Sequence, residues 1–552
     1  FVFNTVDNKV TTGEFKPIKI FGDKSIGYYN VPSNGNSTTT GNFAVDIGAA
    51  GKGNQTFSTA AVSNTTAGKA ITDMNINPSG GNSGKNTNIE GSFGILSNIG
   101  INLTSHQIRI YDKTEKNVGV YPNANVLLNI GGGNIELNGG TGKTSKDNIG
   151  IYVNAQGAVK STGDISVTGG VGNLAIFAVG GALPTGTTNQ VEVGEVKGTN
   201  TKNSVLVYGS NGAKINIAKG MTVTGAGVEA DASTVNKKDT GAAFAEGKGT
   251  EITINRTALP VNENISITGT EQKDSSNKGT GRYVGFGLMA KDGGKINAKF
   301  NNIKVQNGST GVAAIGKDSS GNASEIDLSN SKLTYNGNGY AVYSDGVGKV
   351  NLSDAELNLD GSSTAFDVDL KATTLPITLN ANTRIHANSD DVVAFNLKNA
   401  TGLTTDNGIE TRIKSKIETK LGLGLGSLNN LFTGSTSTGY KVAAVDGGEI
   451  TIGNLDKSGK EGDTAQDKID GYQYFNRFLA QRLKATATGK TIKAILTTAD
   501  AAARYNKQVV GFEMNSSKNA IDNTEAAINL VNSKIIADRN GAGTGAIGAF
   551  IN

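Results

Sequence analysis

A short pattern of strands and turns recurs along most of this chain, and it limits the folds that the sequence can adopt. The clearest copy runs from Asn338 to Val368 and reads NGYAVYSDGVGKVNLSDAELNLDGSSTAFDV. It predicts three short strands, at Ala341–Tyr343, Lys349–Leu352 and Leu357–Leu359, each followed by a turn. Apolar and polar residues alternate along these strands, so one side of each faces a core and the other faces water. The pattern starts again at Ala365–Val368.

Degenerate copies of this pattern cover nearly the whole chain. Most first strands place small residues around one aromatic or aliphatic residue, and a Gly-rich turn follows them. We identify first strands at Ser25–Tyr29, Gly41–Val45, Phe93–Leu96, Val118–Tyr121, Ile149–Tyr152, Leu174–Phe177, Val205–Tyr208, Ala242–Ala245, Gly285–Leu288, Gly311–Ala314, Val392–Phe395, Val442–Val445, Val509–Phe512 and Ile547–Phe550. Second strands occur at Lys214–Ile217, Glu251–Ile254, Lys295–Asn297 and Glu449–Ile452. Third strands occur at Ile165–Val167, Met221–Val223, Ile265–Ile267, Ile303–Val305 and Leu333–Tyr335.

The spacing of the copies is typical of a solenoid or a propeller, since the clearest neighbours lie about 24–37 residues apart. Three strands per repeat favour the solenoid, because a propeller blade has four. The turns are rich in Gly, Asn and Asp, which tolerate the left-handed backbone of a tight corner. We therefore predict an all-β fold, a right-handed parallel β-helix (β-solenoid) with three short strands per coil and two short α-helical insertions.

Aromatic residues recur at matching places in the pattern. We interpret them as a stacked column inside the core, and the alternative is a surface on which a ligand stacks. The residues are Tyr121, Tyr152, Phe177, Tyr208, Phe244, Tyr343, Phe366 and Phe395.

Two segments depart from the strand pattern. In Asn407–Phe432, four apolar residues lie four apart with Lys and Glu between them, which predicts a helix: Ile409, Ile413, Ile417 and Leu421. In Glu461–Gln508, one apolar helical face is formed by Ile469, Tyr472, Phe475, Phe478, Leu479 and Leu483. A second short helix is predicted at Thr498–Arg504. The predicted division is a β-helix at 1–406, a helical insertion at 407–432, a β-helix coil at 433–460, a helical insertion at 461–508, and a β-helix at 509–552 that continues beyond this fragment.

Charge and composition exclude some classes of protein. The 52 basic and 48 acidic residues give a net charge of +4 and form no block of one sign, so we expect no nucleic-acid partner. The absence of Cys from 552 residues fits a chain that crosses an oxidising compartment unfolded. Apolar runs fall far short of the ~20 residues that span a membrane. No signal peptide is present, and both ends fall within strand-like patterns, so we expect a mature or internal piece of a longer protein.

Residues that could carry chemistry are sparse. The two histidines, His106 and His386, lie far apart, and without Cys they predict neither a metal site nor a catalytic triad. The best carboxylate candidates are Asp367 and Asp369, which share one side of a strand, and the pair Asp390–Asp391. Tandem calcium-binding nonapeptides are missing, and no Gly-rich turn leads into a helix that would bind phosphate. We therefore expect no enzyme activity, no metal and no cofactor.

The repeated pattern, G-[VI]-Y-x…G-G-x-I-x-[IL]…[IL]-x-[VL]-x-G, resembles the passenger domain of type V (type Va) autotransporters. The composition, rich in Lys, Asn and Ile, is similar to that of the large fusobacterial outer-membrane adhesins. The resemblance covers nearly all of the chain except the two helical segments. It implies display on the cell surface and anchoring in the outer membrane through a C-terminal barrel that is absent from this sequence. The pattern carries no functional residues, so the resemblance implies architecture and not a binding site.

These observations favour a cell-surface adhesin fragment that attaches cells to one another or to a host through loops and insertions on a rigid rod. Its partner would be a protein or glycan receptor on a host or bacterial surface. Two alternatives stay open: a β-helical polysaccharide lyase or glycosidase, and a structural stalk for a binding head elsewhere in a longer chain. Because Tyr and Arg are enriched at binding hot spots, the predicted partner-binding residues are Tyr472, Tyr474, Phe475, Arg477 and Arg482. The alternative for this segment is that its helices only cover the rod.

Overall fold

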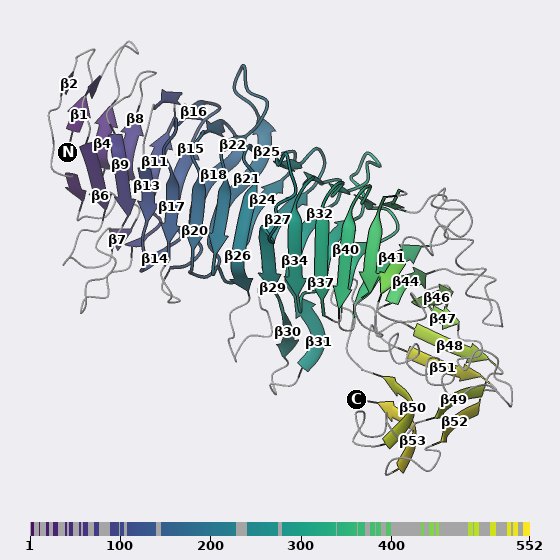
Figure 1. The fold of residues 1–552 in the computed structure, drawn as a ribbon. Helices are drawn as coiled ribbons and strands as arrows, with labels where there is room; N and C mark the ends of the chain where they lie inside the picture. The colour runs from purple at the N-terminus through teal and green to yellow at the C-terminus, as the bar shows by residue number, and fades with distance from the viewer. Residues whose placement is uncertain are drawn as a thin grey trace.

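A computed structural model describes residues 89–387 of this chain almost continuously (Figure 1). Gaps fall at 99, 104–106, 140–144, 228–239, 274–278, 338, 361–362, 370–375 and 381. Outside that range the structure describes strands only, between Val2 and Ile76 and between Val393 and Ile551. Every regular element in the described part is a strand. It contains no helix that is long and apolar enough to cross a membrane.

Most strands belong to three long sheets, which we call the first, second and third sheets. The first sheet has 18 strands: β1 (Val2–Asn4), β4 (Ile26–Asn30), β8 (Thr59–Ser63), β11 (Phe93–Ser97), β15 (Val118–Pro122), β18 (Ile149–Gln156), β21 (Leu174–Ala182), β24 (Val205–Ser210), β27 (Gly241–Glu246), β32 (Phe286–Lys291), β35 (Thr310–Ile315), β38 (Tyr340–Ser344), β41 (Thr364–Asp369), β44 (Val393–Lys398), β46 (Lys441–Asp446), β47 (Glu449–Thr451), β48 (Lys484–Thr488) and β51 (Ala527–Val531).

The second sheet has 10 strands: β12 (Ile101–Asn102), β16 (Leu127–Asn129), β19 (Ala158–Lys160), β22 (Val191–Val193), β25 (Lys214–Ile217), β28 (Glu251–Ile254), β33 (Lys295–Asn297), β36 (Glu325–Asp327), β39 (Lys349–Asn351) and β42 (Ile377–Thr378). The third sheet has 14 strands: β3 (Ile18–Ile20), β6 (Phe43–Ile47), β9 (Ile71–Ile76), β13 (Gln107–Ile110), β17 (Ile135–Asn138), β20 (Ile165–Thr168), β23 (Val196–Thr199), β26 (Met221–Gly227), β29 (Ile265–Thr268), β34 (Asn302–Gln306), β37 (Lys332–Asn336), β40 (Glu356–Asp360), β43 (Arg384–Ala387) and β45 (Phe432–Gly434).

Smaller pairings complete the structure. β2 (Val10–Thr11) pairs with β5 (Thr39–Thr40), and β10 (Ile89–Glu90) pairs with β7 (Gln55–Thr56) and β14 (Thr114–Glu115). An antiparallel hairpin of β30 (Thr270–Lys273) and β31 (Gly279–Val284) projects from the rod (Figure 1). Two-stranded parallel sheets join β49 (Thr491–Ile495) to β52 (Lys534–Asp538), and β50 (Gln508–Met514) to β53 (Gly545–Ile551).

The chain visits the three sheets in turn, which makes it a right-handed parallel β-helix with three strands per coil. β38, β39 and β40, for example, lie in the first, second and third sheets, and each pairs in parallel with the strand one coil earlier. This confirms the predicted fold class, and these strands match those predicted for the pattern that begins at Asn338.

The core fills the space between the three sheets. Alternate residues of each strand point inward, and in the first sheet Ile151, Ile176, Val207 and Leu288 occupy one inward row with no exposed surface. Each fully buried aliphatic side chain of this size stabilises the fold by about 1.5–3 kcal/mol. The alternation seen in the sequence therefore reflects one continuous apolar core along the described coils.

Two strands predicted from the sequence lie in a different sheet from the one expected. Gly41–Val45 was predicted as a first strand, yet β6 lies in the third sheet, with Val45 in register with Ile18 and Met74. The first-sheet strand before β6 is β4, and the next one along the chain is β8, whose sequence Thr-Ala-Ala-Val-Ser lacks the aromatic residue that marks other copies. Glu449–Ile452 was predicted as a second strand, but β47 pairs antiparallel with β46 in the first sheet.

The two predicted helical insertions fall largely outside the described residues. Two strands, β48 and β49, lie within the range 461–508, so residues 484–488 and 491–495 are not helical. The helical spacing from Ile409 to Leu421, the apolar face from Ile469 to Leu483, and Thr498–Arg504 all lie outside the described residues.

A ladder of buried asparagines closes the corner before the first sheet. Asn117, Asn148 and Asn173 have no exposed surface and occupy equivalent places on successive coils. The backbone N–H groups of Asn117 and Asn148 each donate to the side-chain oxygen of the next asparagine, over 3.0 Å in both cases. The side-chain amide of Asn148 also donates to Thr114 Oγ1 and Ser145 Oγ. The ladder thus satisfies backbone groups that a tight corner would otherwise bury unpaired.

A row of aromatic side chains lies on the outer face of the first sheet, and the predicted internal column is therefore wrong for most of its members. Tyr152, Phe177, Tyr208 and Phe244 are in register and partly exposed, while the residue before each of them is fully buried. Their ring centroids lie 5.0–5.4 Å apart. Tyr121 continues the row at 5.1 Å from Tyr152.

The last members of the predicted column lie elsewhere. Tyr343 is in register with the outer row, but it is 3% exposed in a small cluster with Tyr340 and Ala313 outside the main core. Phe366 points inward, because it is in register with the core residue Val342. The backbone of Phe395 is in register with Phe366.

Tyr208 differs from an ordinary surface tyrosine, because its hydroxyl donates to Glu246 Oε2 over 2.7 Å. Burial, followed by the bond to the Glu246 carboxylate and its charge, raises the pKa of Tyr208 from 10.0 to about 12. Since the pKa of Tyr208 is higher in the folded chain, the protonated hydroxyl contributes its full stabilisation below pH 10, and this stabilisation is lost as the pH rises to about 12.

The titration of Tyr208 can be followed by ultraviolet absorbance, and its signal is identified as the one that disappears in Tyr208→Phe. We expect Glu246→Gln to lower the pKa of Tyr208, because the substitution removes the negative charge beside its hydroxyl. An unchanged titration would contradict this prediction.

A row of alternating charges lies on the outer face of the second sheet. Lys214, Glu251, Lys295, Glu325 and Lys349 are in register on five successive strands. Ion pairs join Lys214 to Glu251 at 2.7 Å and Lys295 to Glu325 at 2.9 Å. Opposite charges directly across neighbouring strands stabilise a sheet, so the row supports the stacking order of these coils.

Candidate binding loop

A loop between β28 and β29 presents apolar side chains to solvent. It runs from Arg256 to Glu263, and we call it the 256–263 loop. Val261 is 97% exposed and Leu259 is 43% exposed. Among the described residues, Val347 is the other large hydrophobic side chain that is exposed to solvent. It is 39% exposed and lies on a different corner of the coil. The loop therefore holds the most exposed aliphatic side chain of the described surface, next to Pro260.

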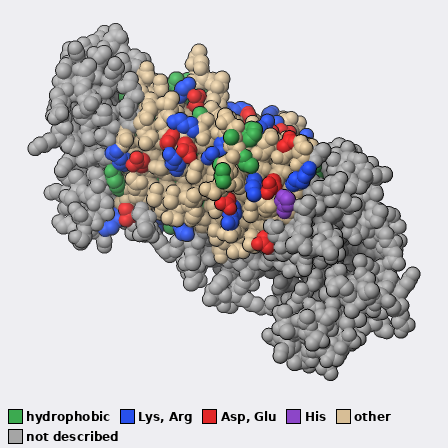
Figure 2. Space-filling view, in the orientation of Figure 1, with side chains coloured by type: hydrophobic (Ala, Val, Ile, Leu, Met, Phe, Trp, Pro, Cys, Tyr) green, Lys and Arg blue, Asp and Glu red, His purple; other side chains and the backbone are tan. Residues whose placement is uncertain are grey.

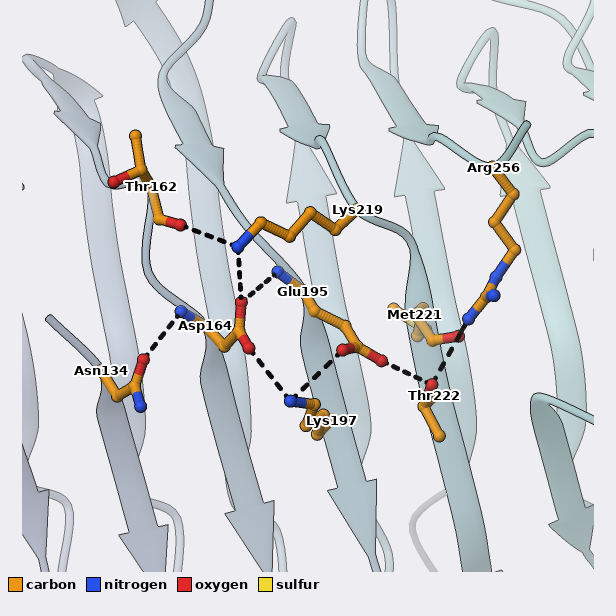
Figure 3. A network of polar contacts seen from close by, with 9 residues as sticks. All are labelled: Asn134, Thr162, Asp164, Glu195, Lys197, Lys219, Met221, Thr222 and Arg256. Atoms are coloured by element: carbon orange, nitrogen blue, oxygen red, sulfur yellow. Dashed lines mark hydrogen bonds and ion pairs between the residues drawn. The ribbon is translucent and has the colours of Figure 1, made fainter. Parts of the chain in front are cut away.

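Arg256 fixes the start of the loop to the preceding coil. Its Nη2 donates to the carbonyl oxygen of Met221 over 2.8 Å and to Thr222 Oγ1 over 3.4 Å (Figure 3). The side chain lies over Gly220, which has a φ of +90°. A Cβ at that position would lie 2.9 Å from Arg256 Cγ and Nε, so the glycine makes room for the arginine. Burial lowers the pKa of Arg256, against the attraction of Glu195.

A network of charged side chains supports this corner on the preceding coils (Figure 3). Lys197 Nζ lies 3.0 Å from Asp164 Oδ2 and 3.2 Å from Glu195 Oε2. Lys219 Nζ lies 3.6 Å from Asp164 Oδ1, and Thr222 Oγ1 donates to Glu195 Oε1 over 2.6 Å. Burial opposes the charge of Asp164, but the backbone N–H of Glu195 and the Lys197 ammonium outweigh it and lower the pKa of Asp164. The network links three coils beneath the start of the loop.

Two asparagines hold the other end of the loop. Asn264, which follows it, donates from Nδ2 to the carbonyl oxygen of Met221 over 3.0 Å and to Asn301 Oδ1 over 2.8 Å. Its Oδ1 accepts the backbone N–H of Asn302 over 2.6 Å. Asn302 Nδ2 in turn faces the carbonyl oxygens of Pro260 and Val261, at 3.4 and 3.5 Å. The loop is therefore held from the coil before it and from the coil after it.

This arrangement suits binding. A loop whose backbone is already fixed loses little conformational freedom when it meets a partner, so more of the contact energy appears as affinity. Exposed aliphatic side chains gain that energy when they leave water. The geometry therefore presents Leu259 and Val261 on a loop whose two ends are held to the side of the rod.

The carboxylates beneath the loop do not have the arrangement of a glycosidase. Such enzymes need one carboxylic acid whose pKa is raised and space between two carboxyl groups for the glycosidic bond. Here the Lys197 ammonium occupies the space between Asp164 and Glu195, and the pKa of Asp164 is lowered. No group of three or more His, Cys, Asp or Glu side chains that could hold a metal is found in the described ranges.

The residues singled out from the sequence are not part of the 256–263 loop, and most of them are outside the described part of the chain. Tyr472, Tyr474, Phe475, Arg477 and Arg482 fall outside the described residues, as do His106 and the pair Asp390–Asp391. The structure places Asp367 and Asp369 on β41, and His386 on β43, where its Nε2 is 3.9 Å from Glu356 Oε1.

The 256–263 loop itself was missed by the sequence analysis, which searched for long departures from the strand pattern. The available signal was the run Leu259-Pro260-Val261 inside a polar connection between two clear strands.

Comparisons with known proteins do not place the chain in a family. No protein-family model matches it, and it has no significant match among curated proteins or solved structures.

Proposed function

We propose that this chain is the extracellular, rod-shaped part of a cell-surface adhesin, and that the 256–263 loop contacts a receptor on another cell. The observation that carries the proposal is the fixed loop with Val261 97% exposed. A parallel β-helix is a rigid support for such a loop, and loops held on rigid scaffolds are common binding sites.

Three further observations support an extracellular adhesin. The chain has no Cys, its repeated pattern resembles autotransporter passenger domains, and the described part of the face in Figure 2 mixes charges of both signs. In this proposal the full-length protein is anchored in the outer membrane, and its receptor is a protein or glycan on a host or bacterial surface. The segment with Tyr472, Tyr474, Phe475, Arg477 and Arg482 is a second proposed contact on the same rod.

The test is binding of the purified chain to a panel of bacterial and epithelial cells. We expect the double variant Leu259→Ser/Val261→Ser to bind at least tenfold more weakly. Burial of each aliphatic side chain is worth about 1.5–3 kcal/mol, and about 1.4 kcal/mol corresponds to a factor of ten. Its melting temperature should fall only slightly, because Val261 is 97% exposed and Leu259 43% exposed in the free chain.

Val347→Ser is the matched control, because it removes an exposed aliphatic side chain from a different corner. It should bind as the unaltered chain does. Failure of the unaltered chain to bind any cell would favour the structural stalk. Binding that survives the double variant but is lost in Tyr474→Ala/Arg477→Ala would move the contact to the second segment.

A further inference from the structure

We propose that the receptor of the 256–263 loop is a protein, with an apolar pocket for Val261 and Leu259 and a carboxylate for Arg256. This inference rests on the proposed function and narrows its partner to one chemical class. Three features of the described surface support it.

The first feature is the chemistry of the loop tip. Leu259, Pro260 and Val261 carry no side-chain hydrogen-bond donor or acceptor. A sugar presents hydroxyl groups, and hydroxyl groups pressed against aliphatic side chains lose their bonds to water without replacement. A pocket lined by apolar protein side chains has no such cost, so it is the better match for this tip.

The second feature is the geometry of the aromatic row. Sugars are often held against the flat face of an aromatic ring. The ring centroids of Tyr121, Tyr152, Phe177 and Tyr208 follow one another at 5.0–5.4 Å. Tyr121–Tyr152 and Phe177–Tyr208 are stacked and Tyr152–Phe177 is tilted by 47°, so each inner ring has one face covered by a stacked neighbour and the other partly covered. The row therefore presents mainly ring edges and hydroxyl groups, which do not form a platform for a sugar.

The third feature is the charge at the start of the loop. The two lysines near it are balanced by two carboxylates, since Lys197 pairs with Asp164 and Glu195, and Lys219 pairs with Asp164. In the part of the chain that the structure describes, Arg256 has no ion pair, and its Nη2 already donates to Met221 and Thr222. A partly buried guanidinium group without an ion pair is stabilised by a carboxylate that comes near it. An acidic side chain beside the apolar pocket would supply the opposite charge that Arg256 lacks here.

The experiment compares three treatments of cells that the unaltered chain binds. The cells are left untreated, digested with a broad-specificity protease, or oxidised with periodate to destroy glycans. Protein-free vesicles of phosphatidylcholine and phosphatidylserine are the fourth probe. We expect protease to abolish binding, periodate to leave it unchanged, and the vesicles not to bind.

Two substitutions test the residues. Arg256→Gln should weaken binding about tenfold and reduce its dependence on salt, because it removes one ion pair from the interface. Release of the loop from Met221 would instead weaken binding without changing its salt dependence. Lys160→Gln is the matched control, since Lys160 on β19 is already paired with Glu192 on β22 at 3.3 Å, on earlier coils of the second sheet. Circular dichroism and thermal melting of both variants check that they are folded.

Loss of binding after periodate would overturn the proposal in favour of a glycan, whatever protease does. Binding that survives protease would also overturn it, and vesicle binding would then identify a lipid surface. Unchanged binding by folded Arg256→Gln would remove the carboxylate from the proposal. Absence of binding to any untreated cell would instead contradict the proposed function itself, so the two failures are distinguishable.

Discussion

Replacement of Asn148 by alanine should lower the free energy of unfolding by about 3–5 kcal/mol, because each buried polar group left without a partner costs about 1–3 kcal/mol. Asn148 Oδ1 accepts from both the backbone N–H and the side-chain amide of Asn117, each over 3.0 Å. Alanine leaves the backbone N–H of Asn117 buried and unpaired, and the side-chain amide of Asn117 keeps only its bond to the carbonyl oxygen of Ile89. The substitution also removes a donor from Thr114 and Ser145. Equilibrium unfolding in urea, followed by circular dichroism, measures the change.

The chain contains its own control for this substitution. Asn123 Nδ2 donates to Asn98 Oδ1 over 2.7 Å in an exposed pair. Water replaces the lost partner at that position, so Asn123→Ala should change stability by less than about 0.5 kcal/mol. Similar losses for Asn148→Ala and Asn123→Ala would show that burial of the ladder is not what stabilises this corner.

Phe177→Ala should cost about 2–3 kcal/mol, although the side chain lies on the outer face of the first sheet. The ring contacts Tyr152 at 5.4 Å and Tyr208 at 5.0 Å, and each aromatic pair is worth about 0.5–1.5 kcal/mol beyond the area that it buries. Phe177→Tyr keeps both contacts and should unfold at nearly the same urea concentration as the unaltered chain. A cost below about 0.5 kcal/mol for the alanine variant would mean that the stacked row contributes little to stability.

The sequence was sufficient to predict the coil, because alternation and turn composition are local properties. In the pattern that begins at Asn338, all three predicted strands are present and lie in three different sheets. The face of an aromatic residue was harder to predict. In Leu174–Phe177, apolar residues occupy both faces of the strand, so alternation cannot decide whether Ile176 or Phe177 points inward. Register decides it: Phe177 is aligned with Tyr152 and Tyr208, and Ile176 with the buried Ile151.

The candidate site depended on contacts that the sequence does not reveal. The run Leu259-Pro260-Val261 is visible in the sequence, but its exposure follows from anchors on other coils. Arg256 reaches back to Met221, and Asn302 reaches from the following coil to the carbonyl oxygen of Val261. Those residues are neighbours only after the coils stack. Helical spacing in the sequence therefore points to 407–432 and 461–508 and not to this short loop.

The alternating charges on the second sheet also limit how many coils can be deleted from or added to this part of the rod without bringing like charges together. If the coil with Glu251 were deleted, Lys214 would face Lys295 across neighbouring strands. If the coils with Glu251 and Lys295 were both deleted, Lys214 would face Glu325, and the attraction would be kept. The backbone repeats once per coil, whereas the surface charge repeats once per two coils. This part of the rod can therefore lengthen or shorten without charge repulsion only in even steps.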